Sequence, residues 1–482
     1  MLATTLVQGE ERAVHRTNTA PSRKAASIEK LPNELLLQIF SYLPDDQHHW
    51  PLLLTARIFL KVTRTALYTS VEFTEKHGRK HILKFLRTVI LQPEIAELVK
   101  TLKLASWKVP QNNKLKRSRH AIFAVSEMKT LMREVEALVP RMGLTPHEQR
   151  HPLSKLSEGR VTLALLQAKL PSLRRFQYDA FRHAQEQWPP IPLTPLILFE
   201  QAELRPMLCN NITHLRLINS RTRTPLPAKH MKLLFLLPAL QILELTYVVV
   251  DDDWVNCFYG DMINSEWVSK APHPALLETS PTPWPVRTSP VTTLRLAQCK
   301  FEGDMLASMI SACTALKEFY YWRIDGGQVK GLGDMPLARL LGAHKDTLHT
   351  LAFNCYNWGS SSNWKFGSFN DFTALKTAKI PPIDSALMPN IEFAHEEPRI
   401  TVRLPQTLET LTIWNVNRER QCIEAFPLTA VQYYPKLWKV YIDSYTSDKN
   451  FLEWKDAVVV PRFNEARVSH EWKVSSKSLA AS

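Results

Sequence analysis

Glycine is scarce in this chain, with 13 residues among 482, against roughly 7% in average proteins. So few glycines leave little material for phosphate-binding loops, and the sequence contains no GxxxxGK[ST], GxSxG or HExxH motif. Its six cysteines include no CxxC pair, which excludes a disulfide framework and the usual zinc spacing. The sequence therefore predicts no catalytic site, no cofactor and no metal centre, and it favours a binding protein over an enzyme.

Long apolar runs are also missing. None approaches the roughly 20 residues that cross a bilayer, and Gln8, Glu10 and Glu11 interrupt the apolar N-terminus before a secretory signal can form. We therefore expect a soluble protein with no membrane contact. Scattered cysteines are typical of a reducing compartment, so the expected location is the cytoplasm, the nucleus or both.

Positive charge is unevenly distributed. The net charge is +14, and residues 51–150 hold 19 Lys/Arg against 8 Asp/Glu. A basic surface can recruit nucleic acid, but the richest run, Lys114 to Arg119, lacks the interleaved aromatic residues of a single-strand platform and is better interpreted as a solvated loop. Nucleic acid is therefore not the favoured partner, and a basic nucleic-acid-binding repeat protein is kept as an alternative.

The N-terminal region changes character at residue 28. Residues 1–27 are polar and aperiodic, which predicts a disordered tail. The sequence LPNELLLQIFSYLP then predicts a short helix, because Pro32 suits the first turn, Glu34 suits the positive end of the helix dipole and Pro44 follows the natural stop. Its apolar stripe is wide for so small a unit, so we expect a partner to cover part of it.

The segment from Leu31 to Val71 resembles the F-box, the helical module by which substrate receptors dock on the Skp-type adaptor of cullin-RING ubiquitin ligases. The resemblance rests on the opening motif, on Arg57 and Phe59, and on the closing residues Leu67, Tyr68 and Val71. It implies a three-helix module over residues 28–72 that binds the adaptor. The implied adaptor-binding residues are Leu31, Pro32, Leu35, Leu36, Ile39, Phe40 and Leu43.

Downstream, an apolar-x-x-apolar-x-apolar pattern recurs ten times. It begins at Val99, Leu173, Ile212, Leu240, Val291, Leu316, Leu348, Leu375, Leu408 and Leu437. The unit from Val291 resembles a leucine-rich repeat, with Cys299 in the Asn/Cys place and a helical segment after it. Helical segments also precede other units, at residues 161–170, 228–237, 337–344 and 418–426.

The predicted fold class is therefore α/β: a short F-box followed by an irregular leucine-rich-repeat solenoid, with parallel strands on the concave side and helices on the convex side. We expect linker helices and the array over residues 73–445, with proline-rich insertions near 185–211 and 254–290. Residues 446–482 are expected to form a C-terminal segment and tail. The whole resembles the F-box and leucine-rich-repeat receptors of filamentous fungi.

In such an array, side chains between the inward residues of each strand face the open, concave side. Tyr, Trp and Arg are the types most enriched in interface hot spots. The target-binding candidates are therefore one group of Arg295, Tyr320 and Trp322 and a second group of Trp414 and Tyr441.

The resemblance implies a substrate-recognition subunit of a ubiquitin ligase, with the Skp-type adaptor and its cullin-RING ligase at one end and an unidentified target protein on the repeats. An F-box scaffold that acts outside a ligase is the other alternative. The sequence names neither the target nor its modification state.

Overall fold

The computed structural model describes part of the chain, and every structural statement below refers to that part. The described residues are 32, 35, 36, 38, 64–65, 67–74, 78–105, 129–130, 133–134, 160–179, 210–218, 228–248, 284–299, 301, 303–323, 336–355, 367–380, 404–414, 423–424, 426–427, 430, 433–444 and 449–474. The chain divides into two compact units, residues 1–68 and 69–482.

The first unit contains the start of the expected F-box helix. Leu35, Leu36 and Gln38 are helical, and the Leu36 N–H donates a hydrogen bond to the Pro32 carbonyl at 3.1 Å. This bond spans four residues, so the helix begins at Pro32 as the sequence predicted. Residues 67 and 68, which end this unit, are helical.

The second unit is built on one open, parallel sheet of twelve described strands, which lie side by side in sequence order. Val71, which the F-box resemblance assigned to the end of the module, lies in the first of them and pairs with Leu102. The strands are β1 (Ser70–Phe73), β2 (Thr101–Ala105), β3 (Arg175–Asp179), β4 (His214–Ile218), β5 (Ile242–Thr246), β6 (Thr293–Ala297), β7 (Glu318–Arg323), β8 (Thr350–Cys355), β9 (Thr377–Ile380), β10 (Thr410–Trp414), β11 (Lys439–Ser444) and β12 (Ser469–Val474).

The ten predicted apolar patterns fall on β2 to β11 in a single register. Leu243 on β5, for example, pairs with Leu215 on β4 and with Leu294 on β6. All three apolar positions of every pattern are buried, with at most 8% exposed surface. The predicted parallel strands are therefore present, and each strand buries its inward residues only against its neighbours and the covering helices.

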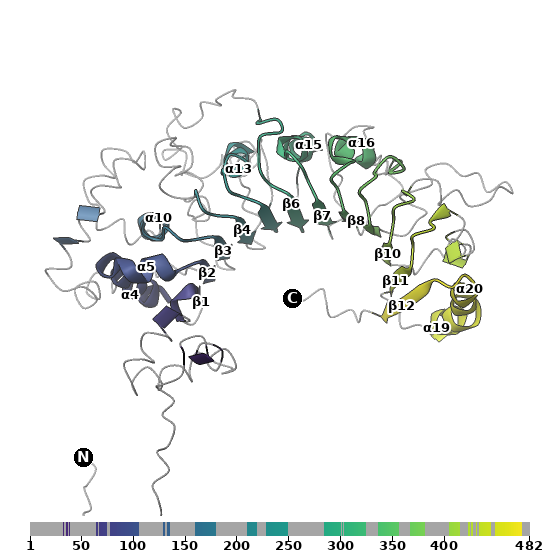
Figure 1. Cartoon of the computed structure of the whole chain (residues 1–482), viewed down its shortest axis with the longest axis horizontal. Helices are drawn as coiled ribbons and strands as arrows, with labels where there is room; N and C mark the ends of the chain where they lie inside the picture. Colours follow the sequence, from purple (N-terminus) through teal and green to yellow (C-terminus); the bar gives the residue numbers. More distant parts are fainter. Residues whose placement is uncertain are drawn as a thin grey trace, which may run out of the picture. The chain divides into compact units, whose positions relative to one another are not determined.

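Helices cover one face of this sheet. They are α4 (Gly78–Leu91), α5 (Pro93–Leu98), α10 (Arg160–Lys169), α13 (Ala228–Leu234), α15 (Gly303–Ala312), α16 (Leu337–Leu341) and the 3-10 turn η7 (Gly342–His344). Figure 1 shows the helices from α4 to α16 on the outer side of the curved row of strands, with the strands on the inner side. This arrangement is compatible with a solenoid-like repeat, and three of the predicted helical segments coincide with α10, α13 and α16 with η7.

Cys299 joins two successive repeats at the turn after β6. Its fully buried Sγ lies 3.3 Å from the Leu245 carbonyl oxygen of the preceding repeat, in the geometry of a hydrogen-bond donor. Burial raises the pKa of this thiol to about 12, so it stays protonated and can donate. The residue expected in the Asn/Cys place of the repeat thus bonds one turn to the next.

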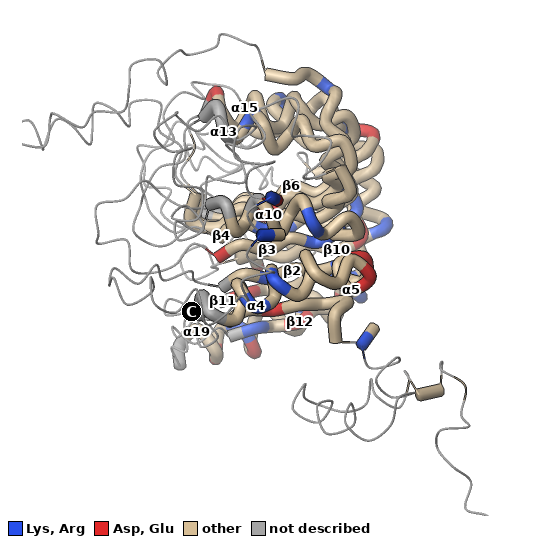
Figure 2. The backbone as a smooth tube through the Cα atoms, turned by 90° about the vertical axis from the view of Figure 1, so that its left-hand side faces the viewer, with Lys and Arg blue, Asp and Glu red and all other residues tan. Residues whose placement is uncertain are grey.

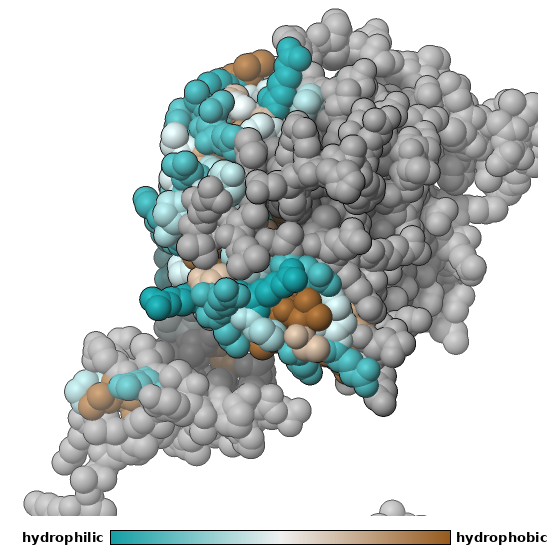
Figure 3. Space-filling view, turned by 90° about the vertical axis from the view of Figure 1, so that its right-hand side faces the viewer, coloured by the Kyte–Doolittle hydropathy of each residue, from teal (hydrophilic) through white to brown (hydrophobic). Residues whose placement is uncertain are grey.

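The sheet continues beyond residue 445, where the sequence analysis placed the end of the array. The C-terminal segment forms α19 (Lys449–Trp454), a π-helical turn η10 (Lys455–Val459), α20 (Val460–Glu465) and β12, which pairs with β11. The inward positions of β12 are His470 and Trp472, and the polar residues Arg467 and His470 stand where the apolar pattern requires apolar side chains, so the pattern missed this strand. Seen from this end of the chain, the described surface is mostly hydrophilic around a compact apolar area (Figure 3).

Candidate functional site

The open face of the sheet carries the side chains that alternate with the buried ones. Its central row contains one residue from each strand, held in register by the parallel pairing. From β3 to β11 this row reads Gln177, Arg216, Glu244, Arg295, Tyr320, Ala352, Lys379, Thr412 and Tyr441. The pairing register of this row is as predicted, but two of its residues, Ala352 and Thr412, are buried.

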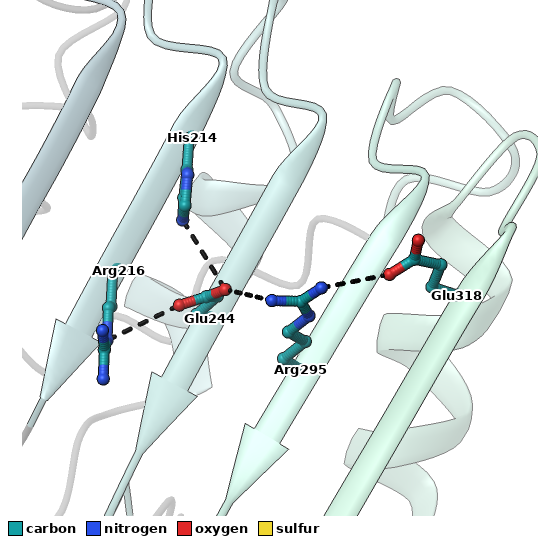
Figure 4. A network of polar contacts seen from close by, with 5 residues as sticks. All are labelled: His214, Arg216, Glu244, Arg295 and Glu318. Atoms are coloured by element: carbon teal, nitrogen blue, oxygen red, sulfur yellow. Dashed lines mark hydrogen bonds and ion pairs between the residues drawn. The ribbon is translucent and has the colours of Figure 1, made fainter. Parts of the chain in front are cut away.

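Five side chains on β4 to β7 form an ionic cluster around Glu244 (Figure 4). The Arg295 guanidinium donates from Nη1 to Glu244 Oε1 at 2.8 Å and from Nη2 to Glu318 Oε2 at 3.2 Å. On the other side of Glu244, Arg216 Nε lies 3.5 Å from Oε2 and His214 Nε2 lies 3.7 Å from Oε1. The ionic cluster is defined as His214, Arg216, Glu244, Arg295 and Glu318.

Glu244 is the most buried carboxylate of this cluster, with 15% of its side chain exposed, whereas Arg216 and Arg295 are each almost half exposed. The neighbouring His214 ring and the two guanidinium groups lower the pKa of Glu244, although burial opposes them. Glu244 therefore stays ionised at neutral pH. Its charge is balanced within the sheet, so Arg295, a predicted target-binding residue, already has two partners.

Aromatic side chains continue the face beyond the ionic cluster. Arg295 also lies over the Tyr320 ring, 4.9 Å from its centroid, so these two predicted neighbours do meet. Trp322, 38% exposed, meets the half-buried Trp414, with ring centroids 5.5 Å apart. The sequence analysis placed these tryptophans in separate groups, and the structure corrects that, because the two rings are in contact across β8 and β9.

The short strand β9 makes room for this contact. Pairing between β7 and β8 reaches Cys355, but pairing between β8 and β9 stops at Ala352 and Lys379. On the other side, Trp414 at the end of β10 lies past the last β9 pair, Ile413 with Ile380. No β9 side chain of the described sheet therefore separates the two indoles. We define the tryptophan patch as Trp322, Trp414, Ala352 and Lys379.

Tyr441 lies further along the row and contacts the last strands. The Lys439 ammonium is 4.4 Å from the centroid of the Tyr441 ring and 3.2 Å from Glu471 on β12. The predicted pair of Trp414 and Tyr441 therefore sits on neighbouring strands, but Tyr441 shares its cation with the edge of the sheet.

The predicted adaptor-binding residues are described in part. Leu35 is 45% exposed and Pro32 is exposed, whereas Leu36 is fully buried. Leu35 and Pro32 are thus available to a partner, and Leu36 contributes to the interior of its own unit. Leu31, Ile39, Phe40 and Leu43 lie outside the described residues.

Other kinds of site find little support among the described residues. They hold no group of three or more His, Cys, Asp and Glu placed to bind a metal ion, and no helix long and apolar enough to cross a membrane. Lys and Arg positions are spread over separate segments of the second unit and do not form one block (Figure 2). The basic run from Lys114 to Arg119 lies outside the described part of the chain.

Comparison with known families gives one match. Residues 28–110 match the family model of the COS11 F-box domain. The matched range includes the helix that begins at Pro32 and continues through α4, α5 and β2. The match supports an F-box protein and does not extend to the later repeats. Among curated proteins, none matches the chain.

Proposed function

We propose that this chain is the substrate-recognition subunit of an SCF-type cullin-RING ubiquitin ligase. The module around residues 28–72 binds the Skp-type adaptor, and the open face of the sheet binds a target protein. The chain performs no chemistry in this scheme. It holds a target near the ligase, which transfers ubiquitin.

The observation that carries the proposal is the F-box match over residues 28–110, taken together with the exposure of Leu35. F-box domains in general bind Skp-type adaptors. A large apolar side chain left 45% exposed on a short helix stabilises a complex when a partner removes it from water. Pro32 is exposed one turn earlier, so the helix start presents a continuous contact.

A co-purification experiment tests the proposal. The full chain is expressed with a tagged Skp-type adaptor, and the adaptor and the cullin are both quantified. Leu35→Asp places a charge in a contact that excludes water, which costs several kcal/mol, so we expect adaptor recovery to fall at least tenfold. Far-ultraviolet circular dichroism of the variant should match that of the wild type, because Leu35 is not part of the core.

The matched control is Val286→Asp, which charges an apolar side chain that is 65% exposed and lies outside the F-box match. It should leave adaptor recovery unchanged. Equal recovery with Leu35→Asp and with wild type contradicts adaptor binding through this helix. Recovery of the adaptor without cullin supports the F-box scaffold instead of the ligase subunit.

A further inference from the structure

The tryptophan patch contains a lysine, Lys379, that the ion pairs of the described sheet do not include. Lys379 stands in the central row between Ala352 on β8 and Thr412 on β10. The outward residues beside it on these strands and its own are threonines, Thr350, Thr377 and Thr410, which carry no charge. Lys379 is partly exposed, and the ion pairs found among the described residues do not include it.

Three carboxylates lie around Lys379 in sequence or register: Glu318 and Asp443 on the open face, and Glu409 just before β10. Asp443, which pairs in register with Trp414, has an interaction of its own. Glu318 on β7 holds Arg295, and Glu409, before β10, holds Lys376 at 2.9 Å. Lys379 therefore presents a cation whose partner the described sheet does not supply. A carboxylate brought by another molecule would form a charge-assisted hydrogen bond there.

The two tryptophans lie one pleat from this lysine. Same-face residues along a strand are two positions apart, roughly 6.6 Å, which is the separation between the row of Lys379 and the row of Trp322 and Trp414. A bound extended peptide has the same spacing between side chains two residues apart. Ala352 and Thr412, on either side of Lys379, are buried, so the surface offered to a partner here consists of the partly exposed Lys379 and the two tryptophans.

We propose that the tryptophan patch binds an extended acidic segment of the target protein. One aromatic or proline side chain of that segment packs on the Trp322 and Trp414 rings, and a carboxylate two residues away reaches Lys379. The inference rests on the proposed function for the identity of the partner as a target, and it adds the chemistry by which the target is recognised. The charges of the ionic cluster are balanced internally, so we do not expect the cluster to contribute to recognition of this target segment.

Selection from a phage library of random 12-residue peptides tests this recognition. The bait is the purified full chain at about 50 mM salt, where charge contacts are weakly screened. Wild type should enrich peptides with Asp or Glu two residues from Trp, Phe, Tyr or Pro. Lys379→Glu should lose this enrichment and select Lys or Arg at the same spacing.

The matched control for this selection is Lys345→Glu, the same charge change at an exposed lysine that directly follows η7 on the helical side. It should select like wild type. If Lys379→Glu selects the same acidic spacing as wild type, or if no pool shows enrichment, the proposal is overturned. The selection contains no adaptor, so its failure is distinct from a failure of adaptor binding.

A synthetic peptide from the wild-type pool then isolates the carboxylate. Replacing its Glu by Gln should weaken binding about tenfold in fluorescence anisotropy, the size expected for losing one charged hydrogen bond. With Lys379→Met, the Glu and Gln peptides should bind equally. Equal binding of both peptides to wild type overturns the assignment, and so does a phosphoserine version that binds more than tenfold tighter than Glu, which would make phosphate the recognised group.

Discussion

The two halves of the open face differ in how their exposed polar groups are paired. On β4 to β7, the ionic cluster sets two arginines and a histidine around Glu244, and Glu318 completes the second contact of Arg295. On β7 to β10, the tryptophan patch pairs two indoles and leaves Lys379 without an ion pair among the described residues. In the first half the charged groups pair with groups of neighbouring strands. In the second half the lysine requires an anion from outside the described sheet.

This difference separates stability from recognition. Cross-strand ion pairs and hydrogen bonds fix neighbouring strands to one another, and their formation does not depend on a partner. Partly exposed tryptophans and an unpaired cation gain free energy only when a partner covers them. Changes in the ionic cluster should therefore be measured as unfolding free energy, and changes in the tryptophan patch as binding.

Removing the C-terminal part of the face should have the largest effect. A chain that ends at Ile380 keeps the ionic cluster but loses Trp414 together with β10, β11 and β12. Because each strand is buried by its neighbours, the buried residues of β9, Ala378 and Ile380, would become exposed. We expect aggregation or strong dye binding, measured by size-exclusion chromatography and fluorescence. A monomeric, cooperatively unfolding product would show that the two halves fold separately.

The tryptophan pair should have the next largest effect. Trp322→Ala and Trp414→Ala should each weaken binding of a selected peptide by about 2 kcal/mol, the usual size for a hot spot. Because the rings touch, the double variant should cost less than the sum by about 0.5–1.5 kcal/mol. Calorimetry on the single and double variants measures this coupling.

Adaptor recovery should be the same for all of these tryptophan variants, which provides the control. Fully additive losses would contradict a shared binding surface. Unchanged peptide binding in both single variants would move recognition to another part of the chain.

The strands could be predicted from sequence because the physics that forms them is local and repeated. Leu240, Leu243 and Leu245 have the same spacing as nine other apolar sets, and side-chain alternation then fixes that Glu244 faces outward. The pattern did not predict β12, because Arg467 and His470 stand at two of its three apolar positions. The inward side chains His470 and Trp472 pack on Phe463 and Phe451 of the C-terminal helices. Aromatic residues such as Phe319 and Tyr321 fit the apolar pattern, but a histidine and an arginine at these positions do not.

The sequence could predict in which row of the open face each candidate residue lies, but it could not predict which of these side chains touch. Register places Trp322 and Trp414 in the same row, yet they belong to strands that are not neighbours. Their contact depends on where β9 ends and on the curvature of the sheet, and neither is encoded in a local pattern. In the same way, the spacing of Arg295 did not reveal that Glu244 and Glu318 would occupy its guanidinium, because those residues come from two different strands.

The ionic cluster should show the smallest of these effects, and only in stability. Glu244→Gln keeps the side-chain shape but removes the charge that Arg295, Arg216 and His214 share. We expect a loss of about 1–2 kcal/mol in unfolding free energy, since the carboxylate is mostly buried while its arginines are half exposed. Urea unfolding at neutral pH measures it. Peptide binding at the tryptophan patch should not change.

The pH dependence of that loss tests its electrostatic origin. The pKa of Glu244 is lowered in the folded chain, so its contribution is complete above the ordinary carboxyl pKa of about 4.3 and is lost as the pH falls through the lower folded value. The stability difference between wild type and Glu244→Gln should therefore shrink on acidification. Glu471→Gln is the matched control, because Glu471 also pairs with a cation, Lys439 at 3.2 Å, but its side chain is 60% exposed. Solvent screens such a pair, so this variant should unfold like wild type at every pH. An equal loss in both variants would mean that burial of Glu244 contributes nothing, and the division of the face into a self-satisfied half and a partner-dependent half would fail.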